Sequence, residues 1–134
     1  MKKNELAAIW LERAASNLAG SVAMLKAGNV NHEDVCYFCQ QTAEKALKAL
    51  CIYLKIEYEF THSVSFLIDI IEKNNFRIPE KIKDASDLTT YAVKTRYPGD
   101  YVRLKKRDSK TAIKKAKSVY DWVEKQVSKN LFSE

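Results

Sequence analysis

The chain has 134 residues, of which only 3 are Gly and 2 are Pro, and 46% of its residues are hydrophobic. This length indicates one domain spanning residues 1–134 with a core of its own. So few turn-forming residues argue against an all-β sandwich or barrel. Residues 94–117 carry a net charge of +8 and the rest of the chain −2. Such a segment attracts phosphates, nucleic acid or an acidic protein, although a merely solvated helix face has the same composition.

The cysteines and the first residues indicate the compartment. Three cysteines, an odd number, imply no disulfide framework. The opening Met-Lys-Lys-Asn-Glu is not followed by the apolar stretch of a secretory signal. No segment approaches the roughly 20 apolar residues of a membrane span. We therefore expect a soluble, cytoplasmic protein that makes no membrane contact.

Apolar residues recur at steps of three and four along the first 56 residues. This period predicts a first helix over 5–27, ended by Gly28. A second helix is predicted over 32–56, with Asn31 as its cap. Its apolar arc is broad enough to pack on two neighbours, so it is expected to lie at the centre of the domain, with a polar stripe on the opposite side.

Two further helices are predicted in the middle of the chain. The third spans about 62–75, capped by Thr61 or Ser63. The fourth spans 79–94, because Pro79 suits a first turn and the helical period continues behind it.

The last helix is predicted over 109–129, with Asp108 or Ser109 as its cap. Five helices with short connectors predict an all-α fold, a five-helix, up-and-down antiparallel bundle.

His32, Cys36 and Cys39 follow one another at helical spacing and invite a zinc interpretation. A structural zinc site needs four ligands, and the sequence has no second pair of cysteines. Cys39 also falls in the apolar stripe, where cysteine packs as a small hydrophobe. We therefore expect neither a metal nor another cofactor. With three glycines, no phosphate-binding loop of the usual form is possible either.

A second candidate lies after the fourth helix, where Arg96 and Tyr97 have Tyr91 and Tyr101 nearby in sequence. Arginine for phosphate and tyrosine for base stacking make a plausible nucleotide site. An arginine at the end of a helix also has a structural reason, since it faces the negative end of the helix dipole.

Several of these segments together resemble one known family, the HEPN domain ("higher eukaryotes and prokaryotes nucleotide-binding"). The resemblance covers about residues 5–129 and rests on Trp10 with Ala14, the run Gln40-Gln41-Thr42-Ala43-Glu44-Lys45-Ala46-Leu47-Lys48-Ala49, Thr61-His62-Ser63, and Arg96-Tyr97-Pro98. It implies an all-α bundle, usually a homodimer, with nucleotide binding proposed for the family. It also implies a possible partner, because many stand-alone prokaryotic members act with a minimal nucleotidyltransferase and some such pairs are toxin–antitoxin systems.

One branch of that family consists of metal-independent RNases with an Arg, four to six residues, and then a His. The positions at this spacing before His62 hold Lys55, Ile56 and Glu57, and those before His32 hold Leu25, Lys26 and Ala27. No arginine occupies any of them, and lysine lacks the planar fork of arginine. No catalytic residue is therefore assigned.

The candidate site joins the polar stripe of the second helix to two later segments. Its predicted nucleotide-binding residues are Gln41, Glu44, Lys45, Lys48, His62, Arg96 and Tyr97. The lysines would offer charge, Arg96 a bidentate contact, and Gln41 and Glu44 hydrogen bonds to sugar or base. Three alternatives stay open: the same polar residues form a buried network that fixes packing or a dimer interface, the protein is an RNase or another nucleic-acid-processing enzyme, or it is a dimeric interaction scaffold without a ligand.

Overall fold

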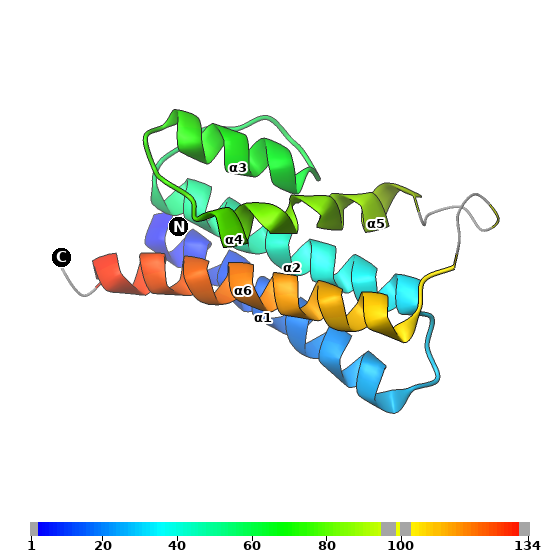
Figure 1. Ribbon diagram of the computed structural model, residues 1–134. Coiled ribbons are helices and arrows are strands. Elements are labelled where there is room, and N and C mark those ends of the chain that lie inside the picture. Colours follow the sequence, from blue (N-terminus) through cyan, green and yellow to red (C-terminus); the bar gives the residue numbers. More distant parts are fainter. Residues whose placement is uncertain (1–2, 95–98, 100–102, 132–134) are drawn as a thin grey trace.

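The computed structural model describes residues 3–94, 99 and 103–131, and these residues form helices and connectors without a strand. The elements, shown in Figure 1, are α1 (Lys3–Ala27), α2 (His32–Tyr53), α3 (Val64–Lys73), α4 (Glu80–Lys83), the 3-10 helix η1 (Asp84–Leu88), α5 (Thr89–Lys94) and α6 (Lys106–Leu131). α4, η1 and α5 follow one another without a break and form the segment predicted as the fourth helix. The predicted all-α helical bundle is therefore confirmed.

Helix α2 lies at the centre of this bundle, as its broad apolar arc predicted. It packs against α1 and α6 on one side and against α3, η1 and α5 on the other (Figure 1). The largest fully buried apolar side chains come from several of these elements and surround α2: Val35, Leu47, Leu50, Val64, Leu67, Ile71, Ile78, Leu88, Val119 and Val123. Among the described helices, none combines the length and apolar character that a membrane crossing requires.

Helices α2 and α3 end in the same way, in Schellman motifs. After α2, Lys55 has a φ of 60° and the Ile56 amide donates to the Cys51 carbonyl over 2.9 Å. After α3, Asn75 has a φ of 65° and occupies the corresponding position. Asparagine tolerates this left-handed conformation, whereas lysine is strained in it. The motif explains why α2 stops at Tyr53, three residues before the predicted end.

The starts of the helices test the predicted caps. Ser63 caps α3, because its hydroxyl accepts a hydrogen bond from the Phe66 amide over 3.1 Å. Asn31 occupies the N-cap position of α2, but its side chain makes no capping bond; its Oδ1 accepts from Arg103 over 2.8 Å instead. The prediction of an Asn31 side-chain cap was therefore wrong, because a residue distant in sequence competes for the same oxygen.

Helix α6 begins at Lys106, three residues before the predicted start. The Asp108 carboxylate reaches back and accepts from the Lys105 amide over 2.7 Å. Asp108 thus does satisfy the start of the helix, but from within its first turn rather than as the residue preceding it.

The connector 54–63 places α3 beside the middle of α2. At the end of this connector, His62 lies within hydrogen-bonding distance of Gln40 and Glu44. Gln40 is thirteen residues before the end of α2, or about 20 Å along the helix. The connector therefore runs back along α2 before α3 begins, and this return brings His62 to the polar stripe.

Candidate functional site

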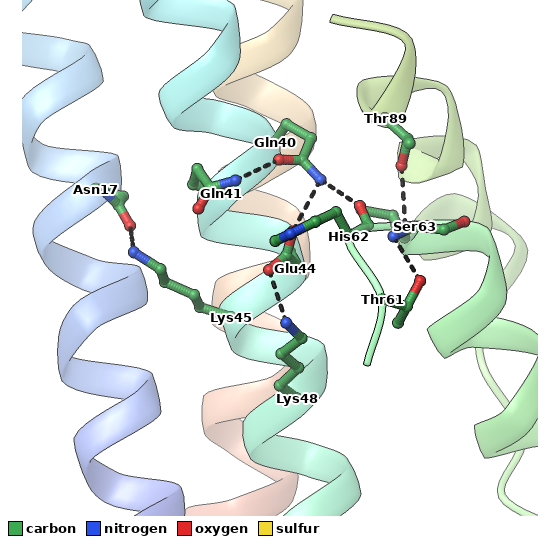
Figure 2. Close-up of polar contacts among 11 residues, drawn as sticks. Asn17, Gln40, Gln41, Glu44, Lys45, Lys48, Thr61, His62, Ser63 and Thr89 are labelled. Carbon is green, nitrogen blue, oxygen red and sulfur yellow. Dashed lines mark hydrogen bonds and ion pairs between the residues drawn. The ribbon is translucent and has the colours of Figure 1, made fainter. Parts of the chain in front are cut away.

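A polar network occupies the face of α2 that meets the connector. Gln40, Glu44 and Lys48 stand four residues apart and therefore share one face of the helix. All three are buried, with exposed fractions of 0%, 3% and 5%. The Glu44 carboxylate is the centre of the network: it accepts from Lys48 over 2.8 Å, lies 3.1 Å from His62 Nδ1, and accepts from Gln40 over 3.3 Å (Figure 2). Within the described residues, every buried side-chain polar atom has a hydrogen-bond partner.

The Gln40 side chain attaches the connector to α2. Its amide nitrogen donates to the His62 carbonyl over 2.8 Å, and its amide oxygen accepts from Gln41 over 2.8 Å. Two residues later, the Val64 amide donates to the Thr89 hydroxyl over 2.9 Å. The main chain at 62–64 is thus attached to α2 on one side and to the start of α5 on the other.

The His62 side chain faces outward from this attachment. It is 62% exposed although its Nδ1 lies 3.1 Å from the buried Glu44 carboxylate. A proton on Nδ1, donated to Glu44, fixes the ring orientation and leaves Nε2 for a ligand or for water. The arrangement suits a histidine that binds a group from solvent.

Lys45 lies near the Glu44–Lys48 pair and near Arg13 of α1. Lys45 donates to the Asn17 side chain of α1 over 2.7 Å. Burial lowers the pKa of Lys45, Glu44 opposes this, and the charges of Arg13 and Lys48 lower it further. Arg13 and Lys48 therefore both lie close enough to Lys45 to repel it, with Glu44 as the carboxylate that opposes them, and such a surplus of positive charge favours an anion.

Two aromatic rings border the same charges. The Lys48 ammonium lies 5.6 Å from the centroid of the Trp10 ring and 5.5 Å from that of Phe60. The Arg13 guanidinium is 6.0 Å from the Trp10 ring. Phe60 meets His62 edge to face, with the centroids 4.9 Å apart, and is itself 84% exposed.

The structure places five of the seven predicted site residues on or beside one stretch of α2. Lys48 and His62 contact Glu44 directly, Gln41 is linked to them through Gln40, and Lys45 is directed toward Asn17 of α1 (Figure 2). Glu44 and Lys48 are buried rather than on an open polar face, because the connector and α1 cover that side of α2. The other two predicted residues, Arg96 and Tyr97, lie outside the described residues.

Sequence reasoning did not assign Gln40, Arg13 or Phe60 to the site. Gln40 was named only within the run that carries the family resemblance, and no role was assigned to it. Arg13 and Phe60 carry no local pattern, and only the packing of α1 and the connector on α2 reveals them.

The cysteine cluster at the start of α2 has a packing role. His32 Nδ1 lies 2.8 Å from the Ser109 hydroxyl of α6. Burial raises the pKa of the Cys36 thiol to about 12 and that of Cys39 to about 11. In the described part of the chain, no group of three or more His, Cys, Asp or Glu side chains is placed to hold a metal ion.

The basic segment forms a stripe along the solvent side of α6. Five exposed cations fall within about 100° of one another around the helix and span about 17 Å: Lys106, Arg107, Lys110, Lys114 and Lys117. Lys117 pairs with Asp121 over 2.6 Å, and the other four form no ion pair with any described residue. The core side of the same helix is apolar, with Ala112, Ala116, Val119, Val123 and Val127 buried.

Comparison with known proteins gives the same family as the sequence motifs. A model of the HEPN domain matches residues 7–126. Among solved structures, ST0689, described as an archaeal HEPN homologue, is 28% identical, with a TM-score of 0.73 over 95% of this chain and 99% of that one. TT1696 from Thermus thermophilus is 26% identical, with a TM-score of 0.74 over 89% of this chain and 96% of that one. No curated protein sequence matches the chain.

Proposed function

The chain belongs to the HEPN domain family, and from this premise we propose that it is a nucleotide-binding module that has no catalytic activity alone. The observation that carries the proposal is the excess of positive charge at the Glu44 network. Lys48 is paired with Glu44, Lys45 lies near this pair and near Arg13, and the exposed His62 ring contacts Glu44 from the solvent side.

Each of these groups has a role in holding a phosphate. The Lys45 ammonium is half-buried, so its charge is less screened than that of a surface lysine. Lys48 is already paired with Glu44 and contributes to the field rather than direct contact. His62 and Gln41 offer hydrogen bonds at the rim, and Arg13 supplies a planar guanidinium that suits a phosphate. Arg96 and Tyr97 remain candidates for the same ligand.

Calorimetric titration with nucleoside mono-, di- and triphosphates tests this proposal. We expect Lys45→Gln to weaken binding about 10- to 100-fold, the usual cost of losing one charge-assisted hydrogen bond. The matched control is Lys81→Gln, which removes an exposed lysine of α4 and should leave affinity unchanged. Absence of binding at millimolar nucleotide by folded protein would refute the proposal.

We also propose that the module acts as a homodimer with a minimal nucleotidyltransferase, as a toxin–antitoxin-like pair. The family resemblance supports both the pairing with a second copy of the chain and the pairing with a nucleotidyltransferase. Sedimentation of the purified chain, alone and mixed with such an enzyme, tests them. A monomer at every concentration, with no complex, would count against this part of the proposal.

Contact with a nucleic-acid backbone is a second candidate function, and the α6 stripe favours it. Four cations without a described ion-pair partner, spread over about two turns of α6, match a row of phosphates. Each phosphate contact to duplex DNA contributes about −0.9 to the slope of log K against log salt. Lys110→Gln should therefore reduce the magnitude of the slope by about one, whereas Lys115→Gln, a lysine paired with Asp87, should not. Cleavage of added RNA that is lost in His62→Ala would instead revive the RNase alternative.

A further inference from the structure

Phe60 is unusual among the large apolar side chains of the described residues. It is 84% exposed, whereas the next most exposed of them, Val22, is 47% exposed. A benzene ring so open to water contributes little to the core, so its position is not explained by folding.

The surroundings of Phe60 are chemically specific. The buried Lys48 ammonium lies 5.5 Å from the ring centroid, and His62 contacts the ring edge to face at 4.9 Å. Much of the Phe60 side chain is left to solvent beside the Lys48 ammonium. An exposed aromatic face next to positive charge is the combination with which proteins hold a base and its phosphate together.

We propose that Phe60 is the stacking platform for the nucleobase of the ligand. The Lys48 ammonium lies against both the Phe60 ring and the Trp10 ring, and Arg13 lies against Trp10. The phosphate of a base stacked on Phe60 would then lie toward Arg13 and Lys45. This inference rests on the proposed nucleotide site and adds what that site recognises. Every base has a π-face, so the ligand class is nucleotides of any base rather than one nucleotide.

The structure provides matched variants for a test. Phe60→Leu keeps an apolar side chain over Lys48 but removes the aromatic face, and Phe60→Trp enlarges that face. Phe66→Leu removes another exposed phenylalanine, 36% exposed in the first turn of α3, and serves as the control. Circular dichroism establishes that each variant is folded.

The probes are pyrophosphate, which has no base, and ADP, titrated calorimetrically. We expect the unmodified protein to bind ADP more tightly than pyrophosphate. Phe60→Leu should weaken ADP binding roughly 5- to 100-fold and change pyrophosphate binding less than about 2-fold. Phe60→Trp should retain ADP binding, Phe66→Leu should match the unmodified protein, and the diphosphates of guanosine, cytidine and uridine should bind within about 10-fold of ADP.

The outcomes separate the two proposals. If pyrophosphate binds but ADP binds no tighter, or if Phe60→Leu leaves the ADP advantage intact, the stacking platform is refuted and the phosphate site stands. If neither probe binds the folded protein, both proposals are refuted.

Discussion

The buried pair of Glu44 and Lys48 gives the sharpest prediction for stability. Glu44→Gln keeps the size and shape of the side chain but leaves the Lys48 ammonium without a counter-charge in a site only 5% exposed. At the observed 2.8 Å, the attraction between the two charges is roughly 6 kcal/mol for an effective dielectric constant of about 20. Removing one partner of such a pair costs about 3–5 kcal/mol, and because glutamine retains hydrogen bonds we expect about 3 kcal/mol.

Urea unfolding followed by circular dichroism measures this loss, and thermal unfolding should show a fall in Tm of about 10 °C. The matched control is Asp121→Asn, which breaks the Lys117–Asp121 pair of α6 at the same four-residue spacing. Because the two side chains of that pair are 63% and 48% exposed, its loss should cost less than about 1 kcal/mol.

A double variant tests the reasoning behind the magnitude. Glu44→Gln combined with Lys48→Met removes both charges and should be more stable than Glu44→Gln alone, since the cost lies in the unpaired buried ammonium. If Glu44→Gln were no more destabilising than Asp121→Asn, the pair would be hydrated in solution and the argument would be wrong.

Three further predictions concern the backbone and the titration of buried groups. Lys55→Gly should raise the free energy of unfolding by about 1 kcal/mol, seen as a higher urea midpoint, because glycine relieves the left-handed strain at φ 60°. Burial raises the pKa of Glu33, but hydrogen bonds from Leu104 and Arg103 outweigh burial and hold this pKa below its ordinary 4.5. The stability that results is present above pH 4.5 and is lost as the pH falls. Glu33→Gln should therefore make the free energy of unfolding less dependent on pH in acid. Burial raises the pKa of the three cysteine thiols from 9.0 to about 11 or 12, so their contribution to stability should be full below pH 9 and fall as the pH rises toward 12. At pH 8 a thiol reagent should label the three cysteines only when the protein unfolds. Rapid labelling of the native protein would contradict their burial.

The helices could be predicted from the sequence because their signals are local. Apolar period, Gly28 and the Ser63 cap act within a few residues of the structure that they specify. The Asn31 side-chain cap could not be predicted correctly, because its oxygen bonds to Arg103, 72 residues away. The early end of α2 also escaped prediction, since Lys55 is not a residue that favours a left-handed turn.

The residues of the candidate site also differ in whether local sequence signals could identify them. Glu44, Lys48 and His62 could be named from the sequence, since helix periodicity groups the first two and the family motif includes all three. Their burial could not, because it depends on the connector running back along α2. No sequence pattern marks Phe60 or Arg13 as a site residue. Only the packing of the connector and α1 on α2 brings them to the site.

The attachment of the connector has a consequence for how the sequence can change. Gln40 holds His62 by its carbonyl, a group that every amino acid possesses, and the amide of Val64 is held in the same way by Thr89. The attachment thus uses the main chain at position 62, while the imidazole adds its own contacts with Glu44 and Phe60. Substitution at position 62 can therefore change the side chain that the site presents to solvent while the attachment of the connector to α2 persists.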